Sequence, residues 1–199
     1  MFRTPIDLRP RVERARSAWK IVAGAAVVLS LAVPASTAAA TATATISAGS
    51  LGFVSTPPNV SFSATLNGTD QTASATQALD ISDATGSGAG WNVTATSTTF
   101  TTGGGTPHLL STTATTITSA PTTACDAGAT CTLATNSISY PYILPAGASA
   151  PTATKVFNAA AASGLGNETV TPTWKLAVPA GTLAGTYTST WTISLVSGP

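Results

Sequence analysis

The stretch from Val170 to Pro199 carries the pattern that most limits how this chain can fold. Two trios, each led by a tryptophan, have apolar side chains at every second position: Trp174, Leu176 and Val178, and then Trp191, Ile193 and Leu195. Successive side chains of a β-strand point to opposite faces, so each trio lies on one face. The stretch therefore predicts two strands, joined by a connection that contains Pro179 and Gly181. We expect the two tryptophan-led faces to pack against each other.

The amino-terminal segment has the three parts of a secretory signal. Met1–Lys20 is polar and basic, Ile21–Val33 is an apolar run, and small residues follow up to Ala40. We therefore expect a signal helix in residues 1–40, with cleavage after Ala40 or Ala42. A retained membrane anchor is the competing interpretation, but a span needs about 20 apolar residues. The rest of the chain, residues 41–199, is predicted to be one secreted domain.

Charge is sparse and unevenly placed. Charged residues make up 8% of the chain, and six of its eight basic residues precede position 21. The part after residue 40 has two lysines and five acidic residues, so it is mildly acidic. Nucleic-acid binding needs clustered Lys and Arg and is not expected. No later apolar segment suits a membrane, which leaves free release or non-covalent retention on the cell surface.

Many short alternating segments, separated by turn residues, predict an all-β domain. Further strands are expected at Thr41–Ser47, Leu51–Val54, Val60–Leu66, Gln71–Ile81, Trp91–Ala95, Leu109–Thr118, Thr132–Tyr140 and Lys155–Ala159. Asn67 and Gly68 predict a hairpin between the third and fourth of these. Short strands at this spacing are typical of a β-sandwich of the immunoglobulin-like or Greek-key type. We expect roughly nine to twelve strands.

Reactive side chains do not form a recognisable catalytic pattern. Cys125 and Cys131 predict a disulfide in an exported chain, worth roughly 2 kcal/mol through loop closure. A metal site would need more ligands, and His108 is the single histidine. Asp80 and Asp83 are expected to stabilise turns rather than to bind calcium or act as an acid–base pair. We therefore predict no metal, no cofactor and no enzymatic activity.

The tryptophans have two interpretations that alternation cannot separate. Trp91, Trp174 and Trp191 can fill the core between two sheets. Exposed tryptophans would instead offer flat faces to sugar rings, whose C–H surfaces pack well on aromatic groups.

Three motifs resemble the WxL-type cell-wall-binding domain of Gram-positive bacteria. They are the glycine-rich run from Asp83 to Trp91, the Trp174–Leu176 motif, and the run from Ala184 through Tyr187 to Trp191 and Ile193. The resemblance covers essentially residues 42–199. It implies a secreted protein held on the wall through peptidoglycan, with other surface proteins as further partners. Departures from the pattern are Ile193 in place of leucine, the cysteine pair, and the lack of a preceding effector domain.

The resemblance also implies the site residues. Trp174, Leu176, Trp191 and Ile193 would form the ligand-binding motifs, and Trp91 and Tyr187 would support them. The tryptophans would either contact glycan or hold the binding face in shape.

A fibre-like, pilus-like or coat-like subunit is the alternative function. In such a subunit a strand such as Thr41–Ser47 would complete a neighbouring molecule by strand addition. An undocked segment 41–47 would favour this alternative, whereas internal pairing of that segment would favour wall binding. Binding of ice or mineral by a threonine-rich surface, and an enzyme, are the remaining alternatives.

Overall fold

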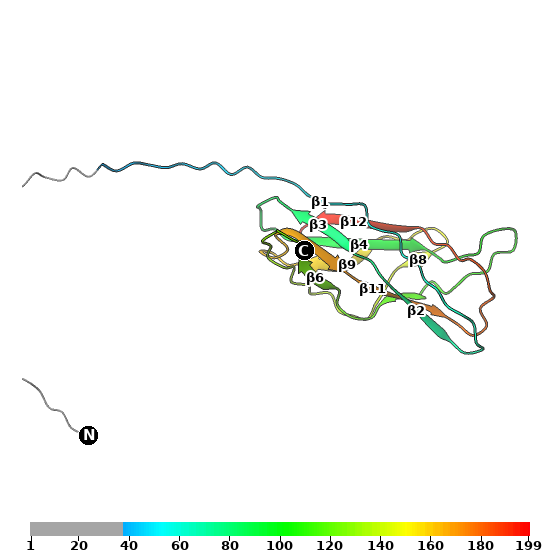
Figure 1. The fold of residues 1–199 in the computed structure, drawn as a ribbon. Coiled ribbons are helices and arrows are strands. Elements are labelled where there is room, and N and C mark those ends of the chain that lie inside the picture. Colours follow the sequence, from blue (N-terminus) through cyan, green and yellow to red (C-terminus); the bar gives the residue numbers. More distant parts are fainter. Residues whose placement is uncertain (1–37) are drawn as a thin grey trace, which may run out of the picture. The chain divides into compact units, whose positions relative to one another are not determined.

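The computed structural model describes residues 38–199 (Figure 1). Within them the chain is all-β, and Thr45–Pro199 form one compact unit. The strands are β1 (Leu51–Phe53), β2 (Gln71–Thr76), β3 (Leu79–Asp83), β4 (Trp91–Thr98), β5 (Thr115–Ile117), β6 (Thr122–Cys125), β7 (Tyr142–Ile143), β8 (Ala146–Gly147), β9 (Thr154–Ala159), β10 (Gly166–Thr171), β11 (Thr173–Val178) and β12 (Trp191–Ser197). The predicted signal helix lies outside the described residues. Across residues 38–199 there is no helix long and apolar enough to cross a membrane.

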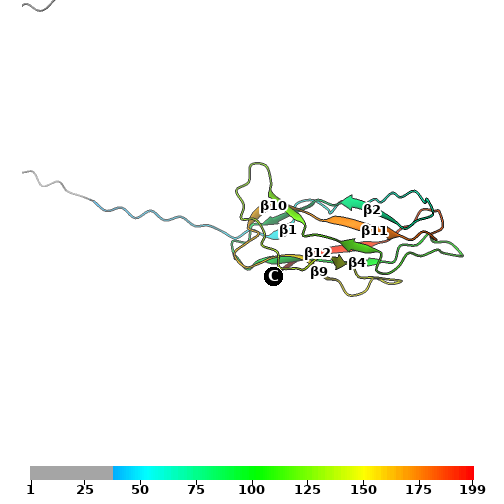
Figure 2. The same cartoon turned by 90° about the horizontal axis from the view of Figure 1, so that it is seen from below.

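The strands form two layers that face each other (Figure 2). One layer contains the sheets β1-β3-β10-β6 and β2-β11-β5-β7, and the other contains β12-β4-β8 with β9 also paired to β4. All pairings are antiparallel except the short one between β4 and β8. Antiparallel layers of short strands agree with the alternating pattern of the sequence.

The two sheets of the first layer follow one another along the chain. β2 leads directly into β3, and β10 leads into β11 through the buried Pro172. Proline has no N–H to donate, so it interrupts the ladder at this point. The Gln77 N–H donates to the Pro172 carbonyl over 3.1 Å and joins the neighbouring strands across the break. Gln77 and Pro172 therefore hold the layer together where its regular pairing stops.

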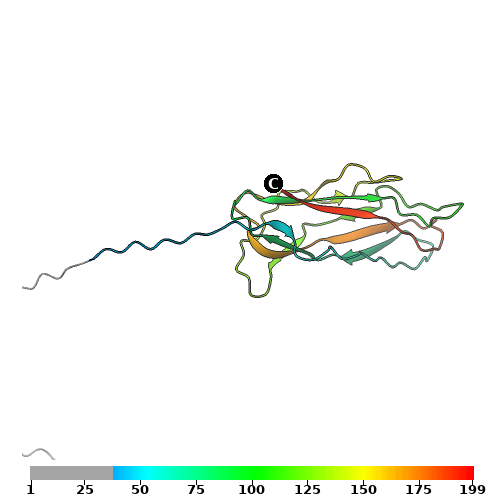
Figure 3. The ribbon, with the colours of Figure 1, turned by 90° about the horizontal axis from the view of Figure 1, so that it is seen from above.

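β4 is the central strand of the second layer. It pairs with β12 along its whole length, from Trp191 opposite Ser97 to Ser197 opposite Trp91. On its other edge it pairs with β9, with a bulge between Val93 and Thr94. β12 is consequently the outer strand of this layer, and Figure 3 shows it in red beside the green β4.

The core lies between the layers and is centred on the predicted tryptophan faces. Trp91 and Trp174 are 0% and 1% exposed, which confirms them as core residues. The Trp91 indole N–H donates to the Gly164 carbonyl over 2.9 Å, so its one polar group is satisfied. Trp174 and Trp191 pack edge to face with ring centroids 4.8 Å apart. The tryptophans that lead the two trios therefore meet from opposite layers, whereas Leu176 and Val178 pack in a second cluster with Ala73.

Three predicted strands are not strands in the structure. They are residues 41–47, 60–66 and 132–140, in which the regular ladder is missing apart from one bridge at Thr132. In the last of these, side chains take the place of a partner strand: the Ser137 N–H donates to Asn158 and the Ala134 N–H donates to Glu168. The predicted hairpin at Asn67 and Gly68 is also wrong, because residues 60–66 do not pair with β2. Alternation identified extended chain here, but a strand also needs a neighbour.

The disulfide is present as expected. Cys125 at the end of β6 is bonded to Cys131, with their Cα atoms 5.6 Å apart. It closes the turn that precedes the bridge between Thr132 and Leu165. The bond thus ties the irregular segment after β6 to the sheet that contains β10.

Glycines let the chain enter β4 through a tight loop. Gly86, Gly88 and Gly90 all have positive φ, which favours glycine. A Cβ at Gly90 would stand 2.4 Å from the Ala159 carbonyl oxygen, whereas one at Gly88 would meet nothing within 4 Å. Of these three positions, Gly90 alone must be glycine both because of its positive φ and because a Cβ would clash with neighbouring backbone.

We predict that Gly90→Ala destabilises the protein more than Gly88→Ala does. Both substitutions place alanine at positive φ, which costs about 1–2 kcal/mol. Gly90→Ala adds a backbone clash that costs roughly a further 1–3 kcal/mol. Free energies of unfolding from urea denaturation measure the difference, and equal values for the two variants would contradict the close packing of Gly90 against Ala159.

Candidate functional site

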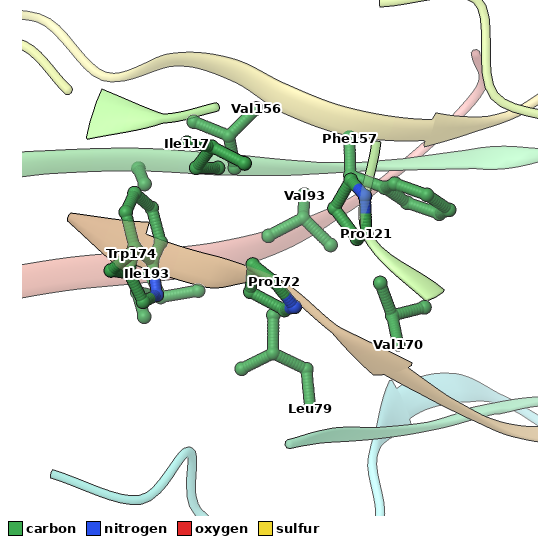
Figure 4. A pocket seen from close by; sticks show the side chains of 11 residues that line it. Leu79, Val93, Ile117, Pro121, Val156, Phe157, Val170, Pro172, Trp174 and Ile193 are labelled. Atoms are coloured by element: carbon green, nitrogen blue, oxygen red, sulfur yellow. The ribbon is translucent and has the colours of Figure 1, made fainter. Parts of the chain in front are cut away.

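A small void lies inside the core. Its volume is about 10 Å³, and apolar side chains line it, including Val93, Ile117 and Trp174 (Figure 4). A cavity needs roughly 10–15 Å³ and polar partners to hold even one water molecule. The void is therefore a packing feature and does not serve as a ligand site.

An open groove runs along one flank of the domain, and we call it the flank groove. Its first part lies between residues 56–61 and residues 187–193, and we call this the β12 part. Its second part lies between residues 60–66 and residues 182–187, and we call this the loop part. The two parts share Val60, Ser61, Phe100 and Tyr187, so they form one continuous depression.

Aromatic side chains from separate segments gather in this groove. Phe62 lies 6.0 Å from Phe100 and 6.3 Å from Trp191, measured between ring centroids. Phe100 and Trp191 are 6.5 Å apart and also meet edge to face. These three residues are half-buried, and Tyr187 joins them in both parts of the groove. Aromatic surface that is partly open to solvent is a typical lining of a binding site.

The groove brings together four of the six residues that the sequence assigned to the site. Trp191 and Ile193 line the β12 part, Leu176 lines the loop part, and Tyr187 lines both. Leu176 is 5% exposed, so it lies at the floor of the groove and offers little surface to a ligand. Trp91 and Trp174 do not reach the groove surface, because both are buried in the core. Neither indole offers a face to a ligand.

Trp174 is nevertheless linked to the groove through Gln77. The Trp174 indole N–H donates to the Gln77 side-chain carbonyl over 3.0 Å. The Gln77 side-chain amide in turn donates to the Pro58 carbonyl over 2.8 Å. Gln77 is 3% exposed, and its bond from Trp174 is buried while its bond to Pro58 is partly buried. This relay fixes the outer wall of the groove, where Pro58 lies, to a core tryptophan.

The lining carries no ionisable acid or base apart from Tyr187. Serine, threonine, Asn59 and Gln77 supply its polar groups, and no Asp, Glu, Lys, Arg or His contributes. The Tyr187 hydroxyl donates to the Leu183 carbonyl over 2.9 Å and holds the loop that forms one wall. The groove is thus suited to an uncharged ligand that combines apolar faces with hydroxyl or amide groups.

Part of this lining comes from residues without a local sequence signal. Phe100 and Leu183 come from loops, and nothing in their local pattern marked them. Phe62 belongs to the alternating segment that was expected to be a paired strand. The alternation of residues 60–66 was the one signal that could have marked Phe62 as a lining residue, because an unpaired segment can present one of its faces to a groove.

His108, Asp80 and Asp83, the reactive side chains considered from the sequence, lie outside the lining of the flank groove. His108 is exposed in a loop. Asp83 accepts hydrogen bonds from the Thr85 N–H and hydroxyl over 3.0 and 2.6 Å, which confirms its predicted turn-stabilising role. The same prediction for Asp80 is wrong, because Asp80 lies within β3 and one of its carboxyl oxygens has no partner. Within residues 38–199, no three His, Cys, Asp or Glu side chains converge to hold a metal ion.

Glu168 is the one acidic side chain that is fully buried among the described residues, and it lies in β10. One of its carboxyl oxygens accepts the Ala134 N–H over 3.0 Å, and the other has no partner. Burial raises the pKa of Glu168 above its ordinary value; the Ala134 hydrogen bond opposes this and the charge of Asp126 adds to it. Burial also raises the pKa of Asp80, again with a contribution from Asp126.

Comparisons of the chain with protein-family models, with curated proteins and with solved structures found no match. The likeness to WxL-type domains therefore stands on the sequence motifs themselves.

We predict that Gln77→Leu destabilises the protein and loosens the groove wall. The substitution removes both side-chain bonds of Gln77 and leaves the buried Trp174 N–H without an acceptor, at a cost of about 1–3 kcal/mol. Gln71→Leu is the matched control, since Gln71 bonds only to its exposed neighbours. Urea denaturation measures the stabilities, and hydrogen exchange around residues 56–61 measures the wall. A loss equal to that of the control would contradict the relay.

We predict that stability falls as pH rises from about 4 towards neutral. With its raised pKa, Glu168 binds more proton in the folded state than in the unfolded state across this window, so unfolding becomes easier as pH increases. Glu168→Gln should flatten the fall. Urea denaturation at a series of pH values tests this, and an equal slope in wild type and Glu168→Gln would contradict it.

Proposed function

We propose that this protein is a secreted, non-catalytic surface protein that binds the glycan of the bacterial cell wall in the flank groove. The observation that carries the proposal is the gathering of Leu176, Tyr187, Trp191 and Ile193 in one groove. These residues belong to the motifs that resemble WxL-type domains. The unpaired segment 41–47, in contrast, is the arrangement expected of the fibre-like alternative.

The lining chemistry supports a glycan ligand. Sugar rings have apolar C–H faces that pack on aromatic side chains, and hydroxyl and acetamido groups that need hydrogen-bond partners. The half-buried Phe62, Phe100 and Trp191 supply the first kind of contact. Side chains such as Asn59 and Ser61 supply the second. The absence of Asp, Glu, Lys, Arg and His from the lining favours the uncharged glycan strand over the charged peptide stems of peptidoglycan.

The buried members of the motifs have a positioning role in this proposal. Trp174 acts through Gln77 on Pro58, and Leu176 lies beneath the loop part. Trp91 packs against Phe157 with ring centroids 5.8 Å apart and supports the core under β4. Truncating any of these three side chains would therefore lower the stability of the fold, so a loss of binding in such a variant would not identify a ligand contact.

The fold and the disulfide agree with a secreted surface protein. We infer that the two antiparallel layers are a β-sandwich of the immunoglobulin-like or Greek-key type, in a domain that spans residues 41–199 after signal cleavage. A disulfide between Cys125 and Cys131 suits an oxidising, extracellular environment. Wall glycan and neighbouring surface proteins are the proposed partners, and no cofactor is required.

We predict that Leu183→Asp weakens binding to isolated cell walls by at least tenfold. Leu183 is 55% exposed and lines the loop part of the groove, so a charge there meets the ligand without disturbing the core. Pelleting of the purified protein with isolated walls, over a range of wall concentrations, measures the change.

Leu109→Asp is the matched control for this experiment. Leu109 is 59% exposed and lies outside the groove lining, so it adds the same charge at a similar exposure. It should bind walls as the wild type does, which also accounts for general repulsion by charged wall polymers. Failure of the wild type to pellet, or equal loss in the two variants, would overturn the proposal.

A further inference from the structure

The outer edge of β12 has no partner strand among the described residues. β12 pairs with β4 alone. The Thr190 carbonyl and the Gly198 N–H both bond towards β4, over 2.9 Å each. Backbone groups of alternate residues in an antiparallel strand point to opposite edges, so those of Trp191, Ile193 and Leu195 point away from β4. Trp191 and Ile193 line the β12 part of the flank groove, whereas Leu195 lies outside its lining.

The opposite wall of the groove is also unpaired backbone. Residues 55–66 form no strand, and no backbone–backbone hydrogen bond joins them to another described segment. Their one described bond to the body of the domain is that from the Gln77 amide to the Pro58 carbonyl. The groove thus runs between two lengths of chain whose backbone groups remain available.

Half-buried apolar side chains follow the same edge. Trp191, Ile193 and Leu195 pack against the core but keep part of their surface open, and Phe62 does the same from the opposite wall. Full burial of such side chains is worth about 25 cal/mol for each Å² removed from water. The flank therefore has both the hydrogen-bonding groups and the apolar surface that an added strand would cover.

The chain also contains an unpaired strand-like segment. Residues 41–47 alternate threonine or serine with Ala42, Ala44 and Ile46, and all of them are exposed. Ile46 is 94% exposed. The segment has the same length as the seven-residue β12, and neither the segment nor the groove lining contains Asp, Glu, Lys, Arg or His.

We propose that Thr41–Ser47 of one copy adds as a strand to the free edge of β12 in a second copy. Its backbone pairs with Trp191, Ile193 and Leu195, and the face that bears Ile46 covers their side chains. Each copy has one donor segment and one acceptor edge, so the contact is head to tail and extends into a chain of subunits. The added strand occupies the β12 part, where Asn59 and Trp191 are also proposed to contact glycan, so assembly and glycan binding compete there, whereas the loop part stays open.

The test compares the association of wild type, Ile46→Asp and Thr45→Asp, each purified as residues 41–199. Sedimentation velocity over a concentration series should show the mass of the wild type rising in steps of one subunit. Ile46→Asp should weaken association at least tenfold, because it places a charge against the core-facing side chains. Thr45→Asp adds the same charge on the opposite face and should associate like the wild type.

A synthetic peptide with the sequence of residues 41–47 provides the second measurement. It should dissociate the wild-type assembly, whereas the same peptide carrying Ile46→Asp should not. A wild type that stays monomeric throughout, equal association of the two variants, or a peptide without effect would overturn strand addition. Leu183→Asp should assemble like the wild type while binding walls weakly, so each of the two proposals can be contradicted without the other.

Discussion

The packing of Trp174 against Trp191 is the contact on which the rest of the structure depends. Trp174 lies in β11 of one layer and Trp191 begins β12 of the other, with their rings at 74° and centroids 4.8 Å apart. An edge-to-face pair of this kind adds about 0.5–1.5 kcal/mol beyond the area it buries. It also sets the spacing of the layers at the point where the flank groove opens, so core packing and groove width are coupled.

Polar groups extend this constraint from the core to the surface. The Trp174 N–H needs a partner because it is buried, and Gln77 supplies one while it also holds Pro58. Gln77 further bonds, through its backbone, to Pro172 at the break between β10 and β11. One glutamine therefore satisfies an indole, joins two strands and positions a groove wall. Replacing Gln77 would leave its buried partner groups without hydrogen-bond partners, which is costly in a protein interior.

The groove owes its form to chain that is extended but unpaired. Residues 55–66 lie where a further strand would complete the flank, and they leave the β12 edge open. Natural proteins usually protect such edges, because an open edge pairs readily with another chain. An open edge beside aromatic side chains is the feature on which both proposals rest, that of a ligand in the groove and that of a strand added from another molecule.

The sequence by itself determined the all-β class, the two tryptophan faces, β4, β9 and the disulfide, because alternation, glycine placement and cysteine spacing are local signals. Leu176, Tyr187, Trp191 and Ile193 were predicted as site residues from the resemblance alone, and their gathering in one groove is seen only in the structure. Only the tertiary structure decided that Trp174 is buried, that 41–47 and 60–66 lack partners, and that Phe100 and Leu183 line a groove. Alternation identifies the two faces of a strand but cannot show which face is inside or which strand is its neighbour, since both depend on contacts between residues far apart in the chain.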